Sequence, residues 1–337
     1  MRISVLKLSP LIGVALAVTG LQACELCAIY RAADARGDFG RGFTFTTAAQ
    51  FVSLRTEQFN GAEFHRAHPD YLDRWMFHLV GGWNLTEKFG VSLNLPIVHQ
   101  SYQRVGIDEQ IRPQTVRADE TGLGDLSVIG RYQVGQISGM TWGGSIHLLA
   151  GLKLPSGDPE HLNEQARLLQ SYEGIVGPGH THDSLGPVTS GIHAHDLALG
   201  SGSIDGVLGL TANARWQRSF FNAQLQYYPR TAGAAGYRYA DEWMAGGGPG
   251  VFLWLRPTAT VGLELNASYD SAGRDELFGR ASDHTGMTAW YLGPRLTFTW
   301  KSHFSAQAGL ELPLRIANRG FQNVPDYRLN TGLTWRF

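Results

Sequence analysis

The sequence has 337 residues, a formal net charge of −1, 42 glycines and 11% aromatic residues. A charge balance this close to zero gives no global field that would attract nucleic acid or a strongly acidic partner, so we expect no nucleic-acid partner. Beyond the N-terminus no stretch reaches 18 consecutive apolar residues, which excludes a membrane-spanning helix in the mature chain. If such a chain crosses a membrane, it must do so with strands closed on themselves.

The first 23 residues have the organisation of a secretory signal peptide. Arg2 and Lys7 supply the basic end, Leu8 to Val18 the apolar core, and Leu21-Gln22-Ala23 a processing site. Residues 1–23 are therefore predicted to be removed on export. Residues 24–41 are then expected to form a short N-terminal periplasmic segment.

Cys24 and Cys27 are the two cysteines of the chain, and they admit two interpretations. Leu21-Gln-Ala-Cys24 resembles a lipoprotein processing box, in which Cys24 would carry lipid. Alternatively, Cys24-Glu-Leu-Cys27 is a C-x-x-C pair that could form a redox-active disulfide or hold a soft metal. The pair is not followed by histidine, which disfavours covalent haem attachment.

From Gly42 to Phe337 we find twelve segments in which apolar and polar residues alternate. The clearest is the last, Tyr327 to Phe337, where apolar side chains and one threonine occupy every second position over eleven residues. Eleven residues are about the length of a tilted strand that crosses a bilayer. A segment of this pattern that stops on an aromatic resembles the terminal signal of bacterial outer-membrane barrels.

The connections between these segments alternate between short and long. Short connections are predicted near 86–88, 135–139, 217–219, 256–258 and 301–303; long ones near 55–71, 103–121, 155–200, 229–240, 271–284 and 316–324. Aromatic residues cluster beside the short turns, as expected at a membrane interface. We therefore predict an all-β fold, a transmembrane antiparallel β-barrel of twelve strands over residues 42–337, closed by pairing 42–54 with 325–337. Its expected location is the bacterial outer membrane, with outer-membrane lipids and the barrel assembly machinery as partners.

The faces opposite the apolar ones carry polar and charged side chains, which a barrel would direct into its lumen. The predicted lumen-lining residues are Arg74, His78, Arg131, His147, Lys153, Arg215, Gln224, Glu264, Arg295, Glu311 and Arg328. Charges buried in a narrow barrel must pair with one another or with water. These side chains could fill the lumen as a solid network, or they could line a polar conduit.

The longest connection, residues 156–200, is expected to cap the extracellular mouth. Asp158-Pro159 predicts the start of a short helix. Further on, the motif His-x-His-Asp occurs twice, and two such units could supply the ligands of a zinc, copper or nickel ion. The candidate ligands are His180, His182, Asp183, His193, His195 and Asp196. The alternative is a polar outer loop whose histidines are solvated.

Four stretches, in this order, resemble one outer-membrane family. They are Leu95-Pro-Ile-Val98, Gly122-Leu-Gly-Asp-Leu126, Gly151-Leu-Lys-Leu-Pro-Ser-Gly-Asp158 and Leu199-Gly-Ser-Gly-Ser203. They are similar to the MetA-pathway phenol-degradation family of outer-membrane β-barrel proteins. The resemblance covers most of residues 72–216 and implies a channel for small, often hydrophobic molecules.

The leading functional hypothesis is an outer-membrane channel for a small solute, which could be hydrophobic or aromatic, and not an enzyme. The first alternative is a metal-handling outer-membrane protein that uses the histidine-rich loop and the N-terminal cysteines, with a divalent transition metal as its cofactor. The second is a barrel enzyme that acts on lipids. Against the enzyme, His78 and His147 point inward by parity, whereas a site that acts on lipid should face lipid.

Overall fold

The computed structural model describes residues 41–65, 70–107, 112–176, 190–301 and 303–337. The predicted signal peptide lies outside the described residues, as do Cys24 and Cys27. No helix in the described ranges is long and apolar enough to cross a membrane.

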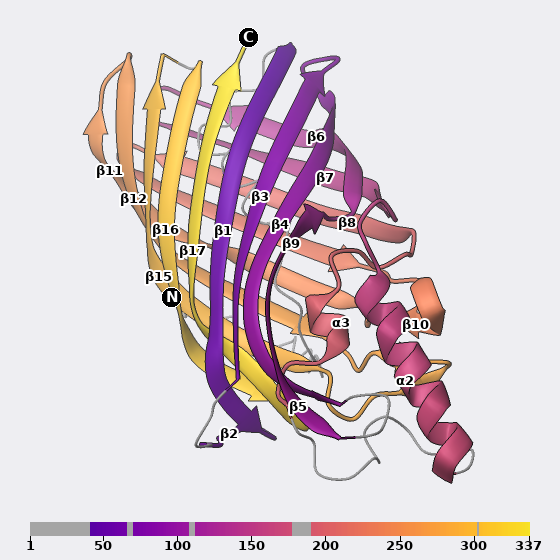
Figure 1. Ribbon diagram of the computed structural model, residues 1–337. Helices are drawn as coiled ribbons and strands as arrows, with labels where there is room; N and C mark the ends of the chain where they lie inside the picture. The colour runs from indigo at the N-terminus through magenta and orange to yellow at the C-terminus, as the bar shows by residue number, and fades with distance from the viewer. Residues whose placement is uncertain (1–40, 66–69, 108–111, 177–189, 302) are drawn as a thin grey trace, which may run out of the picture.

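Twelve long strands in the described chain close into one antiparallel barrel (Figure 1). They are β1 (Gly42–Phe59), β3 (Tyr71–Asn84), β4 (Phe89–Ile107), β6 (Leu126–Ser138), β7 (Trp142–Leu154), β8 (Asp205–Trp216), β9 (Ser219–Tyr228), β11 (Glu242–Leu255), β12 (Ala259–Ala272), β15 (Met287–Trp300), β16 (Phe304–Asn318) and β17 (Phe321–Arg336). The first strand closes the ring on the last, from Thr44 opposite Arg336 to Phe59 opposite Phe321. The predicted strand number, antiparallel arrangement and closure are confirmed.

Alternation along each strand separates an apolar outside from a largely polar inside. Leu148 is 49% exposed, whereas its neighbours His147 and Leu149 are 1% and 3% exposed. The outer surface also carries exposed aromatic residues beside the short turns, among them Trp83, Trp216, Phe221, Trp300 and Phe337. A continuous apolar exterior of this kind suits lipid and would be unstable in water.

Two of the connections expected to be long are instead largely ordered as strands. β4 runs on to Ile107 and returns as β5 (Pro113–Leu123), so most of 103–121 is a hairpin. β16 and β17 are joined by Arg319 and Gly320 alone, so the expected loop at 316–324 is a tight turn. The backbone at Gly320 has a φ of +63°, a conformation that glycine adopts at little cost. In both connections the alternation of apolar and polar residues becomes weaker before the backbone pairing of the strands ends.

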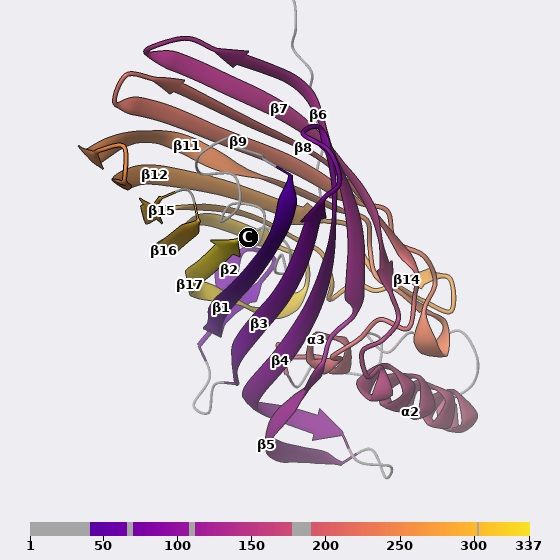
Figure 2. The ribbon, with the colours of Figure 1, turned by 90° about the horizontal axis from the view of Figure 1, so that it is seen from above.

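β4 changes partners part of the way along its length. Its first part, Phe89 to Asn94, pairs with β6, and its later part, Ile97 to Ile107, pairs with β5. The β4–β5 hairpin therefore continues past the body of the barrel, beside the helices (Figure 2). The changeover occurs at the Gly122-Leu-Gly-Asp stretch, where the Gly124 N–H donates to the Pro96 carbonyl at 2.9 Å.

The chain between β7 and β8 supplies two helices, α2 (Glu160–Val176) and α3 (Ala194–Leu197). Asp158 caps the first turn of α2, since its Oδ1 accepts the Glu160 N–H at 3.0 Å, and the predicted helix start is confirmed. Smaller elements at the same end are β2 (Ala62–Glu63), η2 (Ala234–Gly236), β10 (Tyr237–Arg238), β13 (Glu276–Leu277) and β14 (Arg280–Ala281). The last three of these, β10, β13 and β14, form a separate small sheet.

The facing of the strands can be tested by placing arginine on either side of the wall. Leu148→Arg and Leu263→Arg each introduce a cation on the exposed apolar exterior, so each should destabilise the barrel by about 2–4 kcal/mol. Asn213→Arg, on the half-buried inner face of β8, should cost much less. The measurement is urea-dependent folding into lipid vesicles. Equal losses for all three variants would contradict the facing assignment.

Candidate functional site

One part of the lumen is filled by a network of paired charges and amides from neighbouring strands. Arg295 of β15 lies 3.4 Å from Glu264 of β12 and also donates to Asn266. The Asn266 amide in turn donates to Glu311 of β16 at 2.6 Å. All four side chains are buried, so the pairing offsets the cost of removing their charges from water.

Arg328, on the last strand, forms a second buried network. Its guanidinium pairs with Asp270, donates to the Tyr291 hydroxyl at 2.9 Å and lies 3.9 Å from the centre of the Tyr291 ring. Arg328 is only 2% exposed. This arginine therefore ties β17 to β12 and β15 across the inner surface.

The remaining predicted lumen residues lie on inward-facing positions, with different degrees of burial. His78 contacts Asn94 at 3.2 Å, Arg131 donates to Asn84 at 2.9 Å, and His147 is 1% exposed. Arg215 is exposed close to a short turn. Gln224 lines a pocket together with Thr211, Asn222, Gly247 and Arg295.

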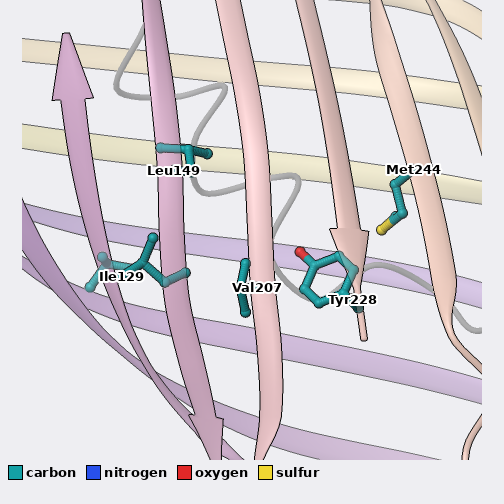
Figure 3. Packing of buried hydrophobic residues seen from close by; sticks show 6 residues of the cluster. Ile129, Leu149, Val207, Tyr228 and Met244 are labelled. Carbon is teal, nitrogen blue, oxygen red and sulfur yellow. The ribbon is translucent and has the colours of Figure 1, made fainter. Parts of the chain in front are cut away.

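The interior is not wholly polar, contrary to the sequence-based expectation of a polar lumen. Six buried apolar side chains from six strands make contact there: Val80, Ile129, Leu149, Val207, Tyr228 and Met244, which we call the apolar patch. Figure 3 shows five of them side by side on adjacent strands. Each of the six occupies the same set of alternate positions along its strand as the polar residues that point inward. Because the predicted lumen residues included only charged and polar types, these six were missed.

A third charge network lies where the β7–β8 connection meets the wall. Lys153 lies 3.0 Å from Asp125 and 3.5 Å from Asp205, and Arg230 links Asp205 to Glu242 at 3.0 Å each. Asp125 also accepts the backbone N–H groups of Gly157 and Ser201, one at each end of the connection. This network fixes both ends of the long segment to the barrel.

The second described part of the histidine-rich loop lies against inward-facing side chains of the barrel wall. Residues 190–200, here called the inner segment, contact the inner wall at several points. The Gln100 amide donates to the Leu197 carbonyl at 2.6 Å, and Arg74 donates to the Asp196 carbonyl. The Asn323 N–H donates to the Gly191 carbonyl at 2.8 Å. Leu197 itself is fully buried, in a cluster with Leu72, Tyr102 and Ile192.

The structure brings together half of the predicted metal ligands. His193 and His195 are each 5% exposed, so neither is a solvated loop residue, and with Asp196 they offer ligand atoms within 4.8 Å of one another. Although burial opposes ionisation, His195 and His193 together hold the pKa of the Asp196 carboxyl below its usual range. His180, His182 and Asp183 lie outside the described residues.

The two histidine rings belong to a longer stack that the sequence did not indicate. His193 lies 5.1 Å from His195, centre to centre, with the rings inclined by 5°; His284 and Tyr237 flank the pair at 6.0 and 5.4 Å. The Tyr239 hydroxyl donates to the His195 carbonyl at 2.9 Å, across 44 residues of sequence. His284 is farther still along the chain, and none of these partners belongs to a recognisable motif, so sequence spacing gave no signal for them.

Helix α2 is held against β5 through His161. Its Nε2 lies 2.8 Å from Glu120 and its Nδ1 3.3 Å from Glu164. Burial alone would lower the pKa of His161, but the two carboxylates outweigh it and raise that pKa above its ordinary value. The ion pair is therefore strongest when the imidazole is protonated.

Comparison with known proteins supports the barrel. No protein-family model matches the sequence, and no curated protein matches it. An outer-membrane channel from Pseudomonas putida is similar in structure, with a TM-score of 0.58 and 14% identity over 89% of this chain and 98% of that one.

Two further structures score lower. They are the β-domain of the Bordetella autotransporter BrkA (TM-score 0.42, 10% identity, 88% of this chain and 100% of that one) and the TodX monoaromatic hydrocarbon channel (0.41, 10%, 88% and 90%). At these scores neither adds to what the first likeness establishes, which is the fold. The closed barrel, its apolar exterior and that likeness together place this chain among the β-barrel proteins of the bacterial outer membrane.

The attachment of α2 should depend on pH. Because the folded-state pKa of His161 is raised, its stabilising contribution is complete at pH below the ordinary histidine value of about 6.5 and is lost as pH rises through the raised value. Hydrogen exchange of α2 amides, corrected for intrinsic rates, should show protection falling as pH rises. His161→Gln should remove that dependence; an unchanged pH profile in this variant would refute the assignment.

Proposed function

We propose that this protein is a passive outer-membrane channel for a small, largely apolar solute. The observation that carries the proposal is the apolar patch. Buried apolar side chains on the inner face of a membrane barrel cannot contribute to the lipid-facing surface, and they do not pair charges. Their remaining use is to contact one another and any apolar molecule that enters the lumen.

The charged networks beside the patch support the same proposal. Arg295 with Glu264, Arg328 with Asp270, and Lys153 with Asp125 and Asp205 are opposite charges in contact. Paired charges cancel at a distance, so they leave little field to select an ion. A lumen without a strong field of one sign favours a neutral solute over an ion.

The proposed solute class also agrees with the sequence resemblance to the MetA-pathway phenol-degradation family, whose members are thought of as channels for small and often hydrophobic molecules. We infer that this chain belongs to that family and transports its solute without catalysis. The inner segment is then the part of the channel that limits the size of what passes.

Selectivity for apolar solutes can be tested at Leu149. Leu149→Asn keeps the approximate size of the side chain but adds a polar amide to the apolar patch, so uptake of a monoaromatic compound into vesicles should fall several-fold. Leu149→Met, which preserves both volume and polarity, should transport as the parent does. Uptake of a small sugar should not fall in either variant. Equal monoaromatic uptake by Leu149→Asn and the parent would count against the proposed solute class.

The size limit can be tested by weakening the anchors of the inner segment. Arg74→Ala together with Gln100→Ala removes two donors to the backbone of α3, so the segment should loosen and single-channel conductance in planar bilayers should rise. His99→Ala on the same strand, whose ring contacts Thr121 instead, is the matched control. Unchanged conductance in the double variant, with the barrel intact, would show that the inner segment does not restrict the pore.

A further inference from the structure

The strongest feature that the proposed transport does not itself require is a three-residue cluster on the inner segment. His193 precedes α3, and His195 and Asp196 lie within it. His193 Nδ1 lies 3.5 Å from one carboxylate oxygen of Asp196, and His195 Nε2 lies 3.6 Å from the other. The start of α3 thus brings two imidazole nitrogens and a carboxylate within 4.8 Å of one another.

The geometry points to a site for one divalent first-row transition ion, with zinc the best match, held by His193, His195 and Asp196. Two imidazoles and a carboxylate are a donor set that zinc uses, and they leave a fourth position for water or another ligand. Calcium and magnesium prefer oxygen donors throughout and are not favoured. The assignment of this site does not rest on the proposed transport.

The distances are compatible with this assignment. The donor atoms lie within 4.8 Å of one another. Zinc bonds of about 2.0–2.1 Å in tetrahedral geometry would place donors about 3.4 Å apart. Because the two rings are now stacked almost parallel, binding of an ion requires the imidazoles and the carboxylate to rotate so that their donor atoms come closer together.

The surroundings hold the ligands in place. The Asp196 carboxylate accepts the His193 N–H at 2.8 Å, and the His195 N–H donates to Gln165 of α2 at 3.1 Å. His284 and Tyr237 enclose the two rings from either side of the stack. Such fixation lowers the ordering cost when an ion binds, as do the outer contacts of known metal sites.

His284 packs against the ring of His193 and is not placed to act as a fourth ligand. Its Nδ1 accepts the Phe321 N–H at 2.9 Å, so the neutral ring carries its proton on Nε2. The Asp196 side chain, in contrast, remains 36% exposed. An ion would therefore reach the site from the side of Asp196, while the two buried imidazoles close the site behind it.

The test is zinc titration by calorimetry of the full chain in detergent after removal of metal with a chelator. The parent should bind about one Zn²⁺ at the site, and His193→Ala with His195→Ala should weaken binding by at least about 100-fold. Asp196→Asn keeps an acceptor for the His193 N–H but loses the charge, so it should weaken binding less. His99→Ala, which removes a histidine of β4 whose ring contacts Thr121, should bind zinc as the parent does.

Two further measurements distinguish zinc bound by this cluster from zinc bound elsewhere on the chain or lost through misfolding. Heat-modifiable migration on gels shows whether each variant still forms a barrel, and Co²⁺ absorption in the visible range reports a low-coordinate site with nitrogen ligands. A variant lacking His180 and His182 should retain the ion. Zinc binding that survives loss of His193 and His195, or that disappears only with His180 and His182, would overturn the assignment. So would a parent that binds no zinc.

Discussion

The structure depends on the requirement that every backbone N–H and C=O group in hydrocarbon finds a partner within the protein. A sheet meets this requirement only when its two edges join, and here β1 joins β17 along almost its whole length. Once the edges are joined, the alternation of side chains gives each strand one face toward lipid and one toward the lumen. The apolar exterior, the paired charges within and the space for an inward-folded loop all follow from that closure.

The interior combines two kinds of surface that are usually kept apart. Buried charges are held in close pairs, and removal of one partner from such a pair typically costs about 3–5 kcal/mol because the other charge is left without compensation. The apolar patch lies on the same wall, and its side chains carry no oxygen or nitrogen except the Tyr228 hydroxyl. Because the charges satisfy one another, the wall can present apolar side chains without leaving a charge buried alone.

Much of the fold could be predicted from the sequence, since a strand that spans lipid must alternate strictly and leaves a clear period of two. The paired strands and their closure are of this kind, whereas the start of α2 was indicated by its capping residue Asp158. The outer hairpin of β4 and β5 could not be predicted, because a ribbon beyond the membrane needs no apolar face. The inward orientation of the residues in the apolar patch could be predicted from their alternate positions along the strands. In the sequence, however, they appear as isolated apolar residues that interrupt a polar face.

The candidate metal ligands illustrate the other limit. His193-x-His195-Asp196 is visible in sequence because neighbouring residues on one helical turn must lie together. The rings of Tyr237 and His284 reach the cluster only through the return of distant strands to the same end of the barrel. Sequence spacing carries no record of that return, so the enclosure of the cluster could be found only in three dimensions.

The inner segment has a kinetic consequence for the chain that carries it. Its contacts with the wall join residues that are far apart in sequence: 120 residues for Ser190 and Asp70, 97 for Gln100 and Leu197, and 122 for Arg74 and Asp196. Contacts of such long range close large loops and are costly in entropy until the surrounding structure exists. The wall that receives the segment includes Asn323 of β17, the last strand. The contact between the segment and Asn323 can therefore form only once the final strand is in place, so docking of the segment is completed after closure of the barrel.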